Sequence, residues 1–171
     1  MQHASGREFA RTAVIGNTAS GKSWLALRLG AQFSLPVTHL DAIRWIDGDF
    51  ARRQTVAQAT ATTCAIAQGQ RWVIEGVYGW LIRPIIGRVT CLIWIDIPWH
   101  ESRANLFARE TARGADGNFD ELEAWSRAYW SRDTGSSHAA HLSLFTDFDG
   151  PKLRLSSMAA TSAFAQRPCV G

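Results

Sequence analysis

Eight consecutive residues near the start of the chain have the types and spacing needed to hold a polyphosphate: Gly16-Asn-Thr-Ala-Ser-Gly-Lys-Ser23. They match the pattern GxxxxGKS/T at every fixed position. Glycines permit a loop whose backbone N–H groups point inward at phosphate oxygens, and a helix beginning at Gly21 adds the positive end of its dipole. In this pattern Lys22 reaches the β- and γ-phosphates, and the Ser23 hydroxyl binds Mg²⁺. The segment predicts a site for ATP, or a related triphosphate, with Mg²⁺.

The residues expected to contact the nucleotide belong to this loop, to the helix after it, or to a later helix that can close over it. The alternative is an accidental glycine-rich turn, but an apolar segment precedes the loop and a helical pattern follows it, as the motif requires. Lys22 is expected to be catalytic as well, because it neutralises charge on the transferring phosphate. The expected nucleotide-binding residues are Gly16, Asn17, Thr18, Ala19, Ser20, Gly21, Lys22, Ser23, Trp24 and Arg109.

Three carboxylates end apolar segments that are predicted to be strands: Asp41, Glu75 and Asp96. In a parallel sheet, ligands bind beyond the carboxyl ends of the strands. Glu75 and Asp96 are therefore candidates, with Ser23, for holding Mg²⁺, and the choice between them stays open. Each could instead cap a helix or pair with a nearby arginine. Asp41 is the candidate for orienting or deprotonating an acceptor hydroxyl, with helix or turn capping as the alternative.

Arginines supply the remaining candidates. Arg109 and Arg113 are four residues apart on one face of a predicted helix, where they can clamp the triphosphate as a lid closes. We expect both to be catalytic by neutralising charge in the transition state, although a solvated helix face is the alternative. The expected acceptor-binding residues are Asp41, Arg44, Arg53 and Arg83. Each of these last three arginines could instead be an ordinary surface residue.

Short apolar runs alternate with longer helical patterns along the chain. The predicted strands are Thr12–Gly16, Pro36–Asp41, Trp72–Glu75, Cys91–Asp96 and Lys152–Leu155. The predicted helices run from about Gly21 to Phe33, Phe50 to Gln68, Trp99 to Arg113, Asp120 to His141 and Ser156 to Gln166, with a short helical piece before Gly87. Ser156 or Ser157 is expected to cap the last helix. This alternation predicts an α/β fold of parallel βαβ units with right-handed crossovers.

The length and composition fit one domain over residues 1–171, with residues 1–11 as a loose tail. All but two of the 18 basic residues are arginine, which suits grip on phosphate, and the net charge is +3. The basic residues are spread among 15 acids without a run, which argues against a nucleic-acid-binding face.

Cysteine usage and hydropathy predict a cytoplasmic protein with no membrane partner. Cys64, Cys91 and Cys169 are far apart and match no CxxC spacing, as expected of reduced thiols. Met1–Arg11 has no apolar signal core, and the apolar stretch Cys91–Trp99 is too short to cross a bilayer.

Taken in order, these segments resemble the nucleoside-monophosphate-kinase-like branch of P-loop proteins, and within it the adenylate-kinase-related topology modulation protein group. The resemblance runs from about Thr12 to Phe164. Besides the glycine-rich loop, its marks are Leu35-Pro-Val-Thr-His-Leu-Asp41, Trp72-Val-Ile-Glu-Gly-Val-Tyr78 with Arg83, Ile93-Trp-Ile-Asp-Ile-Pro98 with arginines in the next helix, and Leu153-Arg-Leu-Ser-Ser157.

This resemblance implies a three-layer P-loop NTPase fold: a five-stranded parallel sheet in the order 2-3-1-4-5, helices on both faces, and a lid after the fourth strand. It also implies ATP and Mg²⁺ as ligands, phosphoryl transfer as the reaction, and Glu75 at the place where adenylate kinases have an aspartate near the metal. The chain departs from those kinases after this acid. They continue Gly-Phe-Pro-Arg, whereas here Gly76-Val-Tyr-Gly79 follows, with no arginine until Arg83.

The sequence thus predicts a kinase that moves the γ-phosphate of ATP to a small-molecule or nucleotide acceptor. Two alternatives remain: an ATP-hydrolysing switch or regulatory module without an acceptor, and a nucleotide-binding protein without turnover. The polar residues expected around Asp41 favour the kinase, because a kinase needs an acceptor pocket. No NKxD motif for reading guanine is present, which favours ATP. The acceptor and the oligomeric state stay open.

Overall fold

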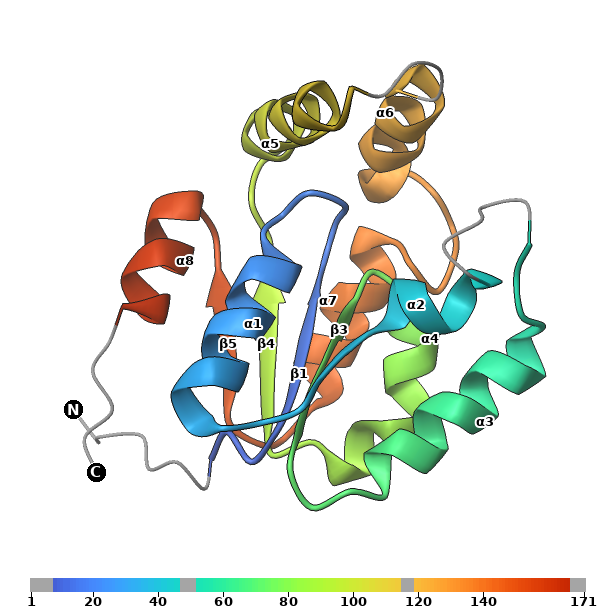
Figure 1. Cartoon of the computed structure of the whole chain (residues 1–171), viewed down its shortest axis with the longest axis vertical. Helices are drawn as coiled ribbons and strands as arrows, with labels where there is room; N and C mark the ends of the chain where they lie inside the picture. The colour runs from blue at the N-terminus through green and yellow to red at the C-terminus, as the bar shows by residue number, and fades with distance from the viewer. Residues whose placement is uncertain (1–7, 47–51, 115–118, 167–171) are drawn as a thin grey trace.

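Five parallel strands form one sheet in the order β2-β3-β1-β4-β5 (Figure 1). The computed structural model describes residues 8–46, 52–114 and 119–166, with only the backbone of Arg113. The strands are β1 Arg11–Gly16, β2 Val37–His39, β3 Trp72–Gly76, β4 Cys91–Ile95 and β5 Lys152–Leu155. The central strand β1 places Val14 beside both Glu75 and Ile93. The predicted α/β class and strand order are confirmed.

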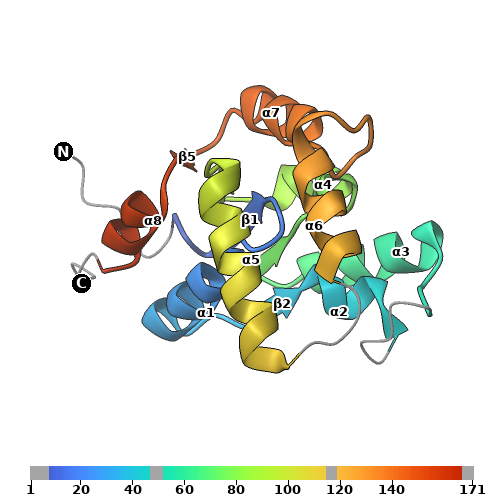
Figure 2. The same cartoon turned by 90° about the horizontal axis from the view of Figure 1, so that it is seen from above.

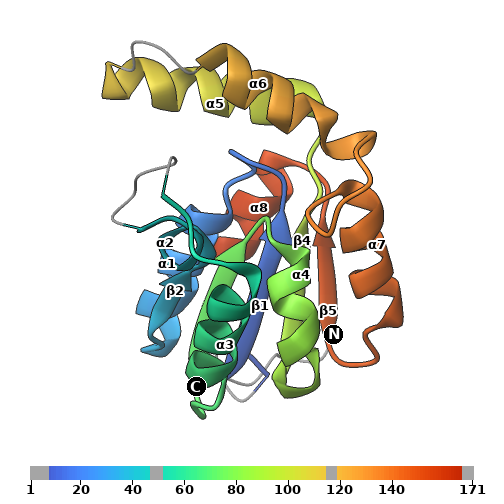
Figure 3. The ribbon, with the colours of Figure 1, turned by 90° about the vertical axis from the view of Figure 1, so that its right-hand side faces the viewer.

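Helices cover both faces of this sheet (Figures 1 and 3). They are α1 Lys22–Phe33, α2 Leu40–Arg44, α3 Val56–Ala67, α4 Gly79–Ile82, α5 Trp99–Arg113, α6 Phe119–Arg127, α7 His138–Asp147 and α8 Met158–Ala165, with the 3-10 turns η2 Arg83–Arg88 and η3 Ala128–Trp130. Helices α1 and α8 pack on one face, and α2, α3, α4 and α7 pack on the other. Within the described residues, no helix is long and apolar enough to cross a membrane.

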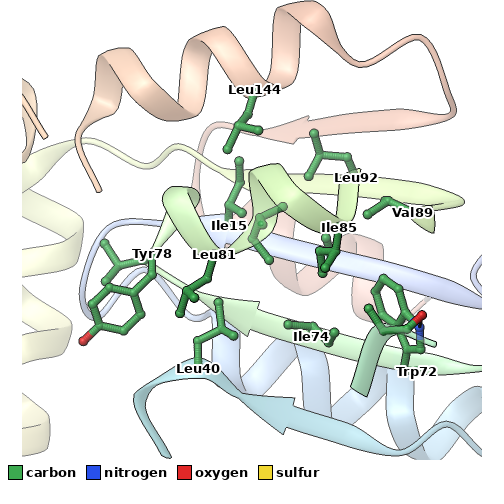
Figure 4. Packing of buried hydrophobic residues seen from close by; sticks show 14 of the residues in the cluster. Ile15, Leu40, Trp72, Ile74, Tyr78, Leu81, Ile85, Val89, Leu92 and Leu144 are labelled. Carbon is green, nitrogen blue, oxygen red and sulfur yellow. Dashed lines mark hydrogen bonds between the residues drawn. The ribbon is translucent and has the colours of Figure 1, made fainter. Parts of the chain in front are cut away.

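Successive residues of the inner strands serve two separate cores. Ala13 and Ile15 point into the core beneath α3, α4 and α7, whereas Val14 between them points into the core beneath α1 and α8. Alternation of this kind follows from the pleat of a strand, and covering both faces requires both sets to be apolar. In the first core, Ile15 and Leu92 from the sheet meet Leu81, Ile85 and Leu144 from the helices (Figure 4). Because packed cores cover both faces of the sheet, the carboxyl ends of its strands are held in fixed positions relative to one another.

Helices α5 and α6 lie across the carboxyl ends of the strands rather than on either face (Figures 2 and 3). We call these two helices the lid pair. Arg103 of α5 bonds Glu123 of α6 at 2.5 Å, and the rings of Phe107 and Phe119 meet edge to face with centroids 5.9 Å apart. The two helices thus form one unit above the sheet edge where the predicted ligand residues gather.

Two predicted elements differ from the structure. The strand predicted over Pro36–Asp41 ends at His39, because Leu40 and Asp41 begin α2, whose end is closed by the bond from Trp45 N to Asp41 O. The helix predicted over Asp120–His141 is interrupted between Arg127 and His138. A Cβ at Gly135 would lie 2.7 Å from Trp80 Cβ, so the chain turns tightly against α4 before α7 begins.

Helix caps explain three other boundaries. Ser137 caps α7 by accepting from Ala140 N at 3.1 Å. Ser157 caps α8 by accepting from Ala160 N at 3.0 Å, and it is one of the two serines predicted for this role. Thr55 and Gln58 form a capping box, so α3 begins at Val56. The predicted start of that helix at Phe50 is too early: Phe50 itself lies outside the described residues, but residues 52–55 are described and precede the helix without being helical.

Candidate active site

The glycine-rich loop joins β1 to α1 in a conformation that side chains would obstruct. Gly16 has φ +153° and Gly21 has φ +94°, and a Cβ at Gly16 would lie 2.4 Å from Ile95 O. Ala19 between them has φ +56°, in the left-handed region. Alternating right- and left-handed residues turn successive backbone N–H groups toward one side, which makes an anion-binding concavity. The strand before the loop and the helix beginning at Lys22 are those that the motif requires.

The side chains within the loop suit a bound phosphate. Lys22 is 8% exposed, and its ammonium donates to Asn17 O at 2.5 Å. Burial lowers the pKa of Lys22, the Glu75 and Asp41 carboxylates raise it, and the Arg109 guanidinium lowers it. Among the described residues, the buried Ser20 hydroxyl has no hydrogen-bond partner. A buried cation beside an unpartnered hydroxyl is an arrangement that an anion would complete.

Ser23 and Glu75, two of the three candidates for holding Mg²⁺, are in direct contact. The Ser23 hydroxyl donates to Glu75 Oε1 at 2.8 Å, and His39 Nδ1 lies 2.6 Å from the same oxygen. The Glu75 side chain is only 4% exposed. In the described part of the chain, no three His, Cys, Asp or Glu residues cluster as an all-protein metal site. Mg²⁺ is commonly held by one or two protein oxygens together with phosphate and water, so these residues fit it.

Asp96 has a different environment. Its carboxylate accepts from Arg154 at 2.5 and 3.0 Å and lies 3.2 Å from His138 Nε2. The Arg154 guanidinium also lies over the Trp94 ring, 4.6 Å from its centroid. Pairing with an arginine was the alternative for this residue. The contacts therefore favour Glu75 over Asp96 as the metal-binding acid.

Asp41 is held by a chain of hydrogen bonds from Tyr78, the residue before α4, and Trp45, the residue after α2. The Tyr78 hydroxyl donates to Asp41 Oδ1 at 2.9 Å and accepts from Trp45 Nε1 at 2.9 Å. Burial and the neighbouring Asp41 carboxylate raise the pKa of Tyr78, so this hydroxyl stays a neutral donor. Arg44 lies over the Trp45 ring at 5.6 Å and the Trp80 ring at 5.7 Å. Asp41 is thus fixed near Lys22, with an arginine and aromatic rings beside it.

The remaining predicted arginines, Arg109, Arg113 and Arg53, have different surroundings. Arg109 is near enough to Lys22 to affect its pKa, and it bonds Glu110 at 2.9 Å. The side chain of Arg113 lies outside what the structure describes. Arg53 is exposed and pairs through its backbone with Trp45.

Two further predicted residues, Arg83 and Trp24, contact residues outside the centre of the site. Arg83 donates to Ser143 Oγ at 3.0 Å, in a groove between α4 and α7 lined by Trp80, Pro84 and Leu144. The structure therefore does not bring Arg83 to Asp41. Trp24 is 39% exposed on α1, beneath Arg28 at 5.5 Å.

The structure also adds residues that the sequence reasoning did not select. His39 contacts Glu75, and its position at the end of a strand beside β3 is the signal that could have indicated this. Arg132 lies 3.8 Å from the centroid of the Trp125 ring and donates to Trp125 O and Ser136 O at 2.8 and 2.5 Å. Burial lowers the pKa of Arg132 to about 10, and Tyr129 and Tyr78 raise it.

The strand order, the loop and the lid pair define the class of fold as that of P-loop kinases. No family model matches the chain, and no curated protein matches it. Three solved structures with this fold are similar over nearly the whole length of both chains. A shikimate kinase from Acinetobacter baumannii, in complex with shikimate, has a TM-score of 0.59 and 11% identity, over 94% of this chain and 93% of that one.

The other two similar structures are a shikimate kinase and a gluconokinase. The shikimate kinase from Bacteroides thetaiotaomicron has a TM-score of 0.54 and 14% identity, over 92% of this chain and 95% of that one. The gluconokinase from Sinorhizobium meliloti 1021 has a TM-score of 0.53 and 10% identity, over 92% and 95%. At these identities the likeness establishes the fold.

Proposed function

We propose that this protein transfers the γ-phosphate of Mg-ATP to a hydroxyl group of a small acceptor. One observation carries the proposal: the loop places the buried Lys22 next to Ser23, whose hydroxyl donates to Glu75 Oε1 at 2.8 Å, and the Asp41 carboxylate and the Arg109 guanidinium are close enough to affect the pKa of Lys22. A phosphate-binding cation, a metal-binding acid and a candidate base are therefore gathered at one edge of the sheet. Phosphoryl transfer needs positioning and charge neutralisation more than covalent chemistry, and these residues supply both.

Each residue has a separate role in this proposal. Lys22 and the N–H groups of the loop hold the phosphates, while Ser23 and Glu75 hold Mg²⁺, which when bound neutralises charge on the phosphate oxygens. Asp41 accepts the proton of the acceptor hydroxyl or orients that hydroxyl, and Tyr78 keeps the carboxylate in place. Arg109, with Arg113, neutralises charge on the transferring group.

The acceptor is proposed to be a small hydroxylated molecule that carries an anionic group. Arg44 is a half-buried cation in the same short helix as Asp41; its guanidinium donates to Gln54 O and lies over the Trp45 ring, and Arg53 is nearby through its backbone pairing with Trp45. The structural neighbours named as a shikimate kinase and a gluconokinase support an acceptor of this size. Within the P-loop kinases, the adenylate-kinase-related topology modulation group remains our proposed grouping, supported by the order of the motifs.

The second candidate is an ATP-hydrolysing switch. It is favoured by direct hydrogen bonds between the loop and both helices of the lid pair, since such bonds can report which nucleotide is bound. A switch would hydrolyse ATP slowly and would need no acceptor.

The experiment that separates the two measures ADP formation from Mg-ATP across a panel of nucleosides, nucleotides and small hydroxylated metabolites. With a true acceptor, we expect the transfer rate of Lys22→Ala to be lower by about 100-fold or more, which is the loss typical of removing one group that stabilises charge in the transition state. Asp41→Asn should keep nucleotide affinity, because Tyr78 can still donate to the amide oxygen, and lose about 10²–10⁴-fold in transfer. If ATP binds but nothing is phosphorylated, and hydrolysis is indifferent to Asp41→Asn, the switch replaces the kinase.

A further inference from the structure

Two asparagine side chains connect the glycine-rich loop to the lid pair. Asn105 of α5 donates from Nδ2 to Ala19 O at 3.1 Å, and Asn17 of the loop donates from Nδ2 to Ser126 O of α6 at 2.9 Å. Asn17 is only 2% exposed. Each lid helix is therefore bonded to a different residue of the loop, so the loop and the lid pair cannot separate without breaking both bonds.

The bonds reach the groups in the loop that would hold phosphate. Asn17 Oδ1 accepts from Thr18 N at 2.8 Å, and Asn17 O accepts from the Lys22 ammonium at 2.5 Å. Ala19, whose carbonyl Asn105 holds, is the non-glycine residue of the loop with φ +56°. A left-handed conformation is unfavourable for alanine and persists where surrounding contacts fix it. The asparagine bonds thus act on the residue that accepts from Lys22 and on the non-glycine residue of the loop that has a left-handed conformation.

A movement of the lid pair would also move the loop, because α5 is attached to α8 at one end and α5 and α6 are bonded to each other. Glu101, one turn before Asn105 on α5, accepts from Met158 N at 2.7 Å and so ties the base of α5 to α8. The Arg103–Glu123 bond then carries any shift of α5 to α6. Movement about the anchored base would change the distances at Asn105 and Asn17 together.

From this geometry we propose that Asn105 and Asn17 are positioning residues that couple nucleotide binding in the loop to closure of the lid pair. The proposal rests on the proposed nucleotide site, and it assigns to Asn17 a role in the loop beyond contact with phosphate. The bonds are made when the lid pair lies over the sheet edge, as in this structure, and they hold the loop in its phosphate-binding shape. Because such coupling is reciprocal, nucleotide must strengthen closure by the factor by which closure strengthens nucleotide binding.

The test uses the full chain and the variant Asn105→Leu, which keeps the side-chain size but removes the donor. Calorimetric titration with Mg-ATP should show about threefold to tenfold weaker binding, the effect of one lost hydrogen bond. Hydrogen exchange adds the decisive readout. In the wild type, Mg-ATP should slow exchange in both the loop and α6. We call the slower exchange in α6 on addition of Mg-ATP the gain in α6. In Asn105→Leu, Mg-ATP should slow exchange in the loop without this gain. Asn105→Gln, which keeps a donor, should restore part of the gain.

The control is Ala104→Gln, an exposed neighbour on the same helix, which should bind and exchange as the wild type does. Asn17→Ala removes the second bond and should also lose the gain in α6, so the proposal stays testable if one variant unfolds. Wild-type affinity and an unchanged gain in α6 for both variants would overturn the coupling. If the wild type binds Mg-ATP no better than Lys22→Ala does, the nucleotide site itself fails, which is a different result.

Discussion

At the scale of single residues, two acids with similar positions in the sequence, Glu75 and Asp96, have different hydrogen-bond partners in the structure. Glu75 and Asp96 both lie at the ends of apolar strands, but Glu75 accepts from Ser23, whereas Asp96 accepts from Arg154. Glu75 has a serine hydroxyl and one imidazole nitrogen of His39 beside it, neither of which is a permanent cation, whereas the guanidinium beside Asp96 always carries a charge that compensates the carboxylate. This difference between their partners is our reason for proposing Glu75, rather than Asp96, as the metal-binding acid.

This assignment predicts different consequences for two matched substitutions. Glu75→Gln should raise the Mg²⁺ concentration needed for ATP binding by about 10-fold or more, because the charged metal-binding oxygen is lost. Asp96→Asn should leave that concentration unchanged and instead lower the unfolding temperature, since it weakens the contacts of this side chain with Arg154 and His138. Magnesium titrations of ATP binding at fixed ATP would measure both. Equal effects of the two variants on Mg²⁺ would contradict the assignment.

At the scale of elements, the contact between β3 and α2 places Asp41. A Cβ at Gly76, the last residue of β3, would lie 2.7 Å from Leu40 Cβ, at the first residue of α2. Absence of a side chain at Gly76 therefore lets α2 begin directly against the sheet. Asp41 is in the first turn of this helix, and Tyr78 lies two residues beyond Gly76. The strand end and the short helix thus set the position of the candidate base together.

Gly76→Ala should disturb both stability and transfer. Overpacking of this kind costs about 1–3 kcal/mol in the free energy of unfolding, and a shift of α2 would displace Asp41 from the acceptor. We expect a lower midpoint in urea and a transfer rate that falls more than ATP affinity does. Gly87→Ala is the control, because a Cβ there meets nothing within 4 Å. Normal transfer in Gly76→Ala would show that α2 tolerates the added methyl group.

At the scale of the whole molecule, a buried polar network joins four segments beneath the site. Trp94 of β4 donates to the Tyr129 hydroxyl at 3.2 Å, Tyr129 lies 2.7 Å from His141 Nδ1, and His141 Nε2 lies 2.9 Å from Val77 O after β3. Val77 O can only accept, so Nε2 carries the proton and Nδ1 accepts from Tyr129. Burial lowers the pKa of His141 to about 3, and the neutral ring satisfies every bond in the chain.

The network predicts a loss of global stability in acid. Between about pH 6.5 and 3 the unfolded chain binds a proton at His141 that the folded chain does not, so stability rises with pH across this window and is lost as pH falls. The loss from this group is up to about 1.4 kcal/mol per pH unit. Urea unfolding between pH 7 and 4 would measure it.

His141→Gln should flatten this pH dependence, although it is less stable than the wild type at neutral pH. His100→Gln, at an exposed histidine, should leave the pH dependence unchanged. A slope in His141→Gln equal to that of the wild type would place the acid-sensitive group elsewhere.

Local patterns in the sequence were sufficient for the parts of the structure that local physics determines. The loop Gly16–Ser23, the apolar runs of β1, β3 and β4 and the helix from Lys22 to Phe33 follow from residue types and short-range spacing. The order of the strands was implied by the resemblance to P-loop kinases, and the structure confirms it. The carboxyl ends of parallel strands meet at one edge, so the gathering of candidate residues there could also be expected.

Tertiary structure alone decided which partner each of these residues has. Ser23 is 52 positions from Glu75, Asn105 is 86 positions from Ala19, and Asn17 is 109 positions from Ser126. Similarly, Asp41 is helical because its neighbour Leu40 packs against Gly76, and the break before α7 depends on how closely Gly135 approaches Trp80. Residue type limits what a side chain can bind, but its partner depends on the packing of distant segments, for which a single sequence carries no local signal.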